Sequence, residues 1–88
     1  MIIWDETKNL KLKLERNISF ETISDIILNK QYLDILENPS RSDQNVFVIE
    51  INKYIYAVPF IIDKESNIIL KTIFPSRKLN KIYGGEND

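Results

Sequence analysis

Residues 46–62, VFVIEINKYIYAVPFII, constrain the fold of this chain more than any other stretch. Two runs rich in β-branched and aromatic residues, 46–51 and 54–62, are separated by only Asn-Lys, the length of a tight β-hairpin turn. A third run of this kind, 67–74, follows the polar segment DKESN, so the three runs predict an antiparallel meander. Pro59 lies within the second run and indicates an edge position or a bulge, because proline has no N–H to donate to a sheet.

The first third of the chain carries the start signals of two helices. MIIW at residues 1–4 predicts a short strand, in which Trp4 is expected in the core. Asp5 is a favourable N-cap for a helix that begins at residue 6. Ser19 is an equally favourable N-cap, and it predicts a second helix over 20–29.

Residues 9–17, NLKLKLERN, allow two interpretations. The alternation of leucine and lysine is typical of a strand with one buried face. The preceding N-cap and the spacing of Thr7, Leu10 and Leu14 instead favour a helix with an apolar stripe along one side. On such a helix Leu12 would lie nearly opposite Leu10 and would be exposed.

The remaining segments complete an α+β domain. We expect a strand over 32–37, a polar loop over 38–45, and a short helix over 77–83 that Ser76 caps and the glycines at 84–85 end. The resulting order is a short N-terminal strand, two helices, a mostly antiparallel four-stranded meander and a short C-terminal helix. Such an order predicts helices packed on one face of the sheet.

Composition excludes several classes of function. A chain of 88 residues (1–88) is expected to form one domain. It has no Cys, which excludes disulfides and thiolate catalysis, and no His, which removes the commonest general base and zinc ligand. We therefore expect no metal and no cofactor. No apolar run approaches the ~20 residues that span a bilayer, and the start lacks an export signal, so the sequence predicts a cytoplasmic protein without a membrane partner.

Several short motifs, taken in order, resemble one protein family. WDETK at 4–8, ISFE at 18–21, the meander, and PSRK at 75–78 resemble the BrnT family, a branch of the RelE/ParE-like ribonuclease toxins of bacteria. The resemblance implies a RelE/ParE-like fold with a helix over 9–17. It also implies a toxin of a type II toxin–antitoxin system, whose partner is a cognate antitoxin protein in a hetero-oligomer. Where the family has Lys-His-Gly, this chain has Glu-Arg-Asn at 15–17.

The implied activity is RNA cleavage without a metal, in which the RNA 2′-hydroxyl is the nucleophile. The protein must then supply a base, an acid and positive charge on the phosphorane. Arg77 is the candidate for that charge, because a guanidinium holds a phosphate bidentately, and Lys8 matches the family's lysine. The candidates for the base or the acid are Glu50, Tyr54, Tyr56 and Tyr83.

Three further cations are candidates for RNA binding. Arg16 lies where the family has histidine and supplies a cation, never a base. Lys71 is expected in the middle of a strand, where it must either snorkel or reach a site. Lys78 follows Arg77 on the last helix.

Two other functions stay open at this point. The chain could be a non-catalytic binding protein on the same fold, which the expected exposure of Leu12 and the low pI of about 5.4 favour. It could also be a small DNA-binding regulator. The sequence disfavours a regulator, because it contains no helix-turn-helix pattern and no basic recognition helix.

Overall fold

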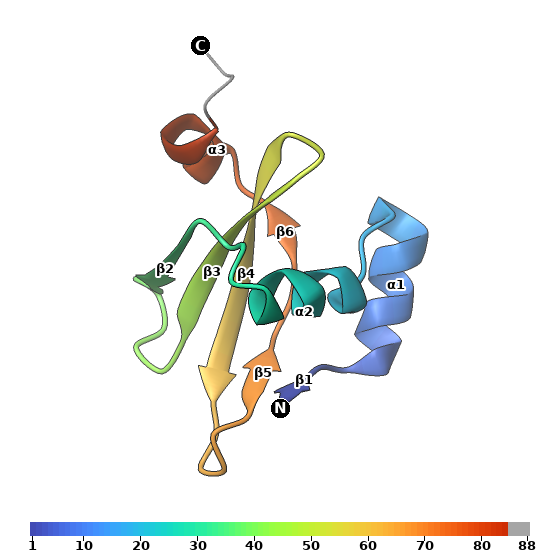
Figure 1. Cartoon of the computed structure of the whole chain (residues 1–88), viewed down its shortest axis with the longest axis vertical. Helices are drawn as coiled ribbons and strands as arrows, with labels where there is room; N and C mark the ends of the chain where they lie inside the picture. Colours follow the sequence, from blue (N-terminus) through green and yellow to red (C-terminus); the bar gives the residue numbers. More distant parts are fainter. Residues whose placement is uncertain (85–88) are drawn as a thin grey trace.

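A hairpin of two long strands, β3 (Asn45–Ile51) and β4 (Tyr54–Ile62), is the centre of the structure (Figure 1). Its turn residues Asn52 and Lys53 have φ values of 52° and 67°, the left-handed conformation that tight two-residue hairpin turns require. The computed structural model describes residues 1–84. Its other elements are β1 (Ile2–Ile3), α1 (Glu6–Arg16), α2 (Phe20–Leu28), β2 (Asp34–Glu37), β5 (Ile68–Leu70), β6 (Phe74–Pro75) and α3 (Arg77–Tyr83).

The strands form one mixed sheet in the order β1-β5-β4-β3-β2, with β6 paired to β4. The pairs from β2 to β5 are antiparallel, as the meander predicts, whereas β1 runs parallel to β5. The main-chain carbonyl of Met1 accepts a hydrogen bond from the N–H of Ile68 at 2.9 Å, so the first residues of the sequence join a strand formed late in it, at one edge of the sheet. The predicted α+β class is confirmed.

The strand register separates the hairpin into two faces. Phe47 pairs with Val58 on one face, which α1 and α2 cover, and Phe20 and Ile23 of α2 are fully buried in the same cluster. Val48 pairs with Ala57 on the opposite face, where α3 packs. The expectation that all helices share one face is therefore wrong. Both strands are apolar at odd and even positions, and a strand of that kind needs cover on both faces.

Helix α1 buries a different side from the one its leucine spacing suggests. Leu10 is 55% exposed and Leu14 is 87% exposed, whereas Leu12 is 7% exposed and Asn9 is fully buried. The helix itself is confirmed, and the Asp5 carboxylate caps it by accepting from two backbone N–H groups of the first turn. The predicted apolar stripe with Leu10 and Leu14 is wrong. The side that is buried contains the polar residue Asn9, so hydrophobic spacing does not identify it.

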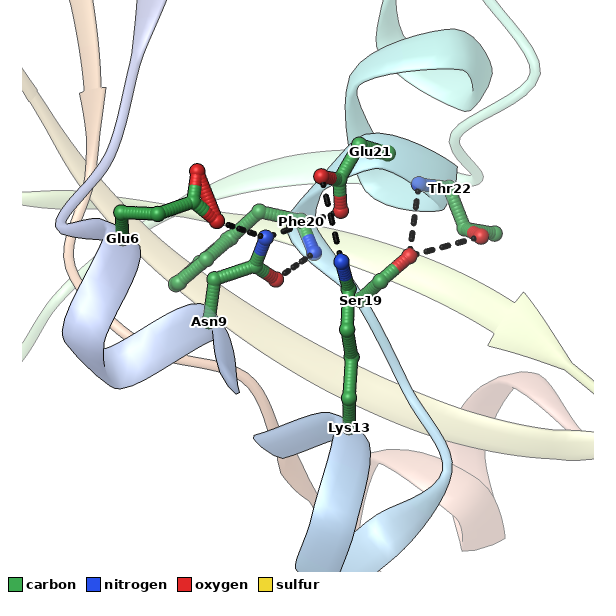
Figure 2. Close-up of polar contacts among 7 residues, drawn as sticks. All are labelled: Glu6, Asn9, Lys13, Ser19, Phe20, Glu21 and Thr22. Atoms are coloured by element: carbon green, nitrogen blue, oxygen red, sulfur yellow. Dashed lines mark hydrogen bonds and ion pairs between the residues drawn. The ribbon is translucent and has the colours of Figure 1, made fainter. Parts of the chain in front are cut away.

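The side chain of Asn9 holds the two N-terminal helices together (Figure 2). Its Oδ1 accepts from the Phe20 N–H at 2.8 Å, and its Nδ2 donates to Glu6 at 2.8 Å and to Glu21 at 2.9 Å. Lys13 forms an ion pair of 3.3 Å with Glu21 on the outside of this contact. The amide thereby satisfies a free N–H in the first turn of α2, where helices lack internal partners. Trp4 is half-buried and stacks on Phe20 with centroids 5.9 Å apart.

The predicted strand over 67–74 is interrupted. Phe60 pairs with Leu70 and Ala57 pairs with Phe74, so three residues, 71–73, lie opposite the two residues between those positions on β4. One extra residue against a partner strand is the arrangement of a β-bulge. Pro59 lies opposite this interruption on the central strand β4, so the edge interpretation is wrong, and the extra residue lies in the neighbouring segment rather than in β4 itself.

Helix α3 is fixed to the far face of the sheet by the side chains of Asn80, in its middle, and Tyr83, at its end. Ser76 caps it by accepting from the Leu79 N–H at 3.1 Å, and the Asn80 Oδ1 accepts from the Ile55 N–H of β4 at 3.1 Å. The Tyr83 hydroxyl donates to the Asp34 carboxylate of β2 at 2.7 Å. Gly84 is the C-cap residue, and the second glycine of the predicted stop, Gly85, lies outside the described residues.

Asn9→Ala is expected to destabilise the protein by about 1–3 kcal/mol, because it leaves the buried Phe20 N–H without a partner. Leu14→Ala on the same helix is the matched control, and its effect should stay within about 0.5 kcal/mol because Leu14 is 87% exposed. Urea unfolding followed by circular dichroism measures both changes. Equal destabilisation by the two variants would show that the Asn9 contact does not hold the helices.

Candidate functional site

Two of the predicted cations, Lys8 and Arg16, bind the interrupted part of the sheet. The Lys8 Nζ donates to the Lys71 carbonyl at 2.9 Å, and the Arg16 guanidinium donates to the Ile73 carbonyl at 3.3 Å. Carbonyls in this segment need other partners, because residues 71–73 do not continue the strand. Hydrogen bonds from both cations therefore hold α1 against the bulge.

The same cations line a shallow hollow of about 220 Å³ between α1 and the bulge. Lys11 and Glu15 of α1 also line it, so the surface there carries three cations and one carboxylate. Positive charge of this kind attracts phosphate. No base or acid from the predicted set lines this hollow, and Glu15 is the one carboxylate among the described residues that line it, so the arrangement suits binding of an anion.

Lys71 does not lie in the middle of a strand, as the sequence predicted. Strand β5 ends at Leu70, and Lys71 is the first residue of the bulge, with an exposed side chain. Its N–H donates to the Pro59 carbonyl at 2.8 Å, which keeps the bulge close to β4. The backbone of Lys71 thus bonds to the neighbouring strand and to Lys8, whereas its side chain is exposed.

Glu50 and Tyr54, the predicted base and acid, lie on opposite faces of the sheet. Glu50 pairs with Ile55, whereas Tyr54 pairs with Ile51 one residue further along the hairpin. Side chains of directly paired residues share a face and successive residues alternate, so the sheet separates Glu50 from Tyr54. Tyr54 instead contacts Tyr56 edge to face, with ring centroids 6.1 Å apart. The two candidates are not brought together.

Arg77 and Lys78 open helix α3 on the face that carries Glu50. Both side chains are exposed, and neither has a hydrogen bond or ion pair within residues 1–84. The backbone under them is fixed, because the Ser76 N–H donates to the Ile55 carbonyl at 3.0 Å. The structure thus presents an exposed Arg77 at a junction that this backbone hydrogen bond holds against β4.

Tyr83 takes a structural role that sequence reasoning missed. Its hydroxyl donates to Asp34, and this hydrogen bond lowers the pKa of the Asp34 carboxyl below its usual range and raises the pKa of the Tyr83 phenol. A phenol held in its protonated form is a poorer proton donor to a substrate. The contact joins the C-terminal helix to the edge strand β2, and no local signal in the sequence links residues so far apart.

Two apolar hollows lie one on each face of the sheet. The first, which we call the α3 groove, has a volume of about 560 Å³ and is lined by Leu36, Glu37, Asn38, Pro39, Val46, Ala57, Pro59, Phe74, Ser76, Lys78, Leu79 and Ile82. The second, which we call the aromatic hollow, has a volume of about 620 Å³ and lies at the end of α2. In the sequence, the unbroken apolar runs of β3 and β4 were the one indication that both faces of the sheet carry apolar surface and hence of the two hollows.

Comparison with protein-family models, curated proteins and solved structures gives no match to this chain. Within residues 1–84, no helix has the length and apolar character that crossing a membrane requires. The same residues bring together no group of three or more carboxylates that could hold a metal ion.

Tyr83→Phe is expected to lower stability between about pH 4 and pH 10 and to lose this effect outside that window. The lowered pKa of Asp34 contributes stability above the ordinary carboxyl pKa, and the contribution disappears as pH falls through the folded-state value. The raised pKa of Tyr83 contributes below the ordinary phenol pKa, and that contribution disappears as pH rises through its own folded-state value.

Thermal melts of the parent and of Tyr83→Phe from pH 2 to pH 11 measure this difference. Tyr54→Phe removes a hydroxyl for which no hydrogen bond is described, so it is the matched control and should show no such window. A pH-independent difference between parent and Tyr83→Phe would contradict the assigned contact.

Proposed function

We propose that this chain is a protein-binding module of the RelE/ParE-like architecture that its sequence resembles, and that it docks a partner protein in the α3 groove. The observation that carries the proposal is that α3, only seven residues long, covers part of an apolar sheet face and leaves the rest open. Apolar surface of this extent is typical of interaction sites.

The open part of the groove has exposed apolar residues on both sides. Phe74 of β6 is 40% exposed and Ile82 of α3 is 63% exposed, while Val46 and Ala57 form the floor between them. A partner that inserts an apolar helix or strand between these rims would bury them together, in the manner of helix-in-groove recognition. Glu37 and Lys78 at the margins supply one charge of each sign for orientation.

The resemblance supplies the partner class. A BrnT-like toxin binds a cognate antitoxin, which would make this chain one half of a cytoplasmic hetero-oligomer. The groove fits such a role, because an antitoxin held by an apolar surface with few charges binds stably without strong electrostatic attraction.

Binding is favoured over catalysis by the positions of the candidate residues. Glu50 and Tyr54 lie on opposite faces, and Lys8 and Arg16 are engaged with main-chain carbonyls. An acid and a base that act on one phosphate must both reach it within hydrogen-bonding distance. Glu50 and Tyr54, which the sequence offered for these roles, form no such pair.

A metal-independent ribonuclease that uses the RNA 2′-hydroxyl is the second candidate, and one observation favours it. Arg77 has no partner within residues 1–84, lies on a rigid junction and has Lys78 beside it. A guanidinium in that position is free to hold a phosphate. The two candidates differ in whether Arg77 is needed for any toxic effect.

Ile82→Asp is expected to weaken binding of the antitoxin encoded beside this chain by at least about thirtyfold, because a charge would enter the apolar interface. Leu14→Asp is the matched control, since Leu14 is 87% exposed on α1 and distant from the groove, and it should leave binding unchanged. Isothermal titration of the purified pair measures both, with circular dichroism melts to show that each variant is folded. Unchanged affinity for Ile82→Asp would refute docking in the groove.

Expression of the chain alone in a bacterium separates binding from catalysis. We expect growth arrest that co-expressed antitoxin relieves, and we expect Arg77→Ala to leave the arrest unchanged. If the chain is instead a ribonuclease, Arg77→Ala should lower the rate about 100- to 1,000-fold and restore growth, and Arg77→Lys should recover little. Growth curves and RNA integrity after induction distinguish the two, and normal growth at high soluble expression would exclude the toxin proposal.

A further inference from the structure

The aromatic hollow lies on the helix-covered face of the sheet, away from the α3 groove. Phe47 and Phe60 form its floor, each 3% exposed, and their rings stack with centroids 4.2 Å apart. The Tyr32 ring contacts the Phe47 ring, with centroids 5.1 Å apart, and Trp4 also lines the hollow. The volume of about 620 Å³ lies within the ~300–1,000 Å³ of typical small-molecule sites.

The upper margin of the hollow is apolar and open to solvent. Leu28 is 69% exposed, Ile35 is 43% exposed and Ile62 is 59% exposed, and all three line the hollow. These three side chains come from α2, β2 and β4, so the fold collects them from distant parts of the sequence. A ligand that lies across the floor would remove apolar surface on every side from water.

Within the described part of the chain, the charge of the side chains that line the hollow is of one sign only, positive. Lys30 is the one charged side chain among its lining residues within 1–84, and no carboxylate lines it, although acidic residues outnumber basic ones in the whole chain. Ser24 and Ser66 add hydroxyl groups to the lining. The polar groups at this site thus suit an anion rather than a cation.

The backbone at the end of α2 leaves the Lys30 ammonium unengaged. Lys30 has a φ of 54°, and its N–H donates to the Ile27 carbonyl at 3.0 Å, while the Gln31 N–H donates to the Ile26 carbonyl at 2.9 Å. Asn29 occupies the Asp25 carbonyl with both its N–H and its side-chain amide. These last-turn carbonyls already accept hydrogen bonds, so the Lys30 side chain does not cap the helix. Within residues 1–84 that side chain has no hydrogen bond or ion pair.

We propose that the aromatic hollow binds a free medium-chain fatty-acid-like carboxylate, with its alkyl chain on Phe47 and Phe60 and its carboxylate at Lys30. An uncharged apolar ligand would desolvate part of the lysine without compensation, whereas a carboxylate forms a charge-assisted hydrogen bond with it. The site does not depend on the proposed docking function, since the α3 groove lies on the other face of the sheet.

The chain carries its own reporter for this test, because Trp4 is its single tryptophan and lines the hollow. Titration of the full chain with 11-(dansylamino)undecanoate should give saturable energy transfer from Trp4 to the dansyl group at one probe per chain. Decanoate should displace the probe, and the methyl ester of the probe should bind more weakly.

Three variants separate the contributions to binding. Lys30→Met should weaken binding of the carboxylate probe about tenfold or more and change binding of its methyl ester less than about twofold. Ile62→Glu should weaken both probes, because it places a negative charge at the apolar margin. Lys81→Met, at an exposed position of α3 on the other face of the sheet, is the matched control and should change neither.

Several results would overturn the proposal. Equal affinity of Lys30→Met and parent for the carboxylate would show that Lys30 is not its partner. Energy transfer that does not saturate would exclude a defined site, and binding only to anionic phospholipid vesicles would assign the surface to a membrane. A concentration-dependent dimer that Ile62→Glu abolishes, with no probe binding, would make a second copy of the chain the occupant.

Discussion

The buried amide of Asn9 is the contact on which the arrangement of the N-terminal half depends. It meets one backbone N–H and two carboxylates, a combination that no hydrophobic residue can replace. A buried polar group is stable only when its partners are in place, so this amide permits one relative position of α1 and α2. That position in turn directs Lys8 and Arg16 of α1 to the carbonyls of the bulge. The sheet interruption and the helix pair are thus parts of one connected arrangement.

Local chemistry made much of the fold predictable from the sequence. The caps Asp5, Ser19 and Ser76 all act as expected, and the Asn-Lys turn closes the hairpin, because each of these effects involves residues close together in the chain. The buried side of α1 was not predictable, since its central residue is polar. The position of α3 was not predictable either. The apolar runs of β3 and β4 indicate that both faces of the sheet need cover, but they do not indicate which helix covers which face.

The candidate site was predictable in residue type and not in arrangement. The sequence indicated which cations and carboxylates are present, and Arg77 at its helix start follows from the Ser76 cap. Whether Glu50 and Tyr54 meet depends on a pairing register in which a shift of one residue exchanges the two faces. Whether Lys8 is free for a ligand depends on a carbonyl 63 residues away. Long-range geometry of this kind separates a set of suitable residues from an active site.

The parallel pairing of β1 with β5 also has a consequence for how the protein matures on the ribosome. The helices and the hairpin are closed by contacts between near neighbours, and they can form as soon as their own segments emerge. The first strand, by contrast, pairs with residues 68–69, so its backbone groups stay unpaired until that segment is made. Until residues 68–70 emerge, β1 therefore remains a strand without a partner, and during that interval a chaperone or another nascent chain can pair with it.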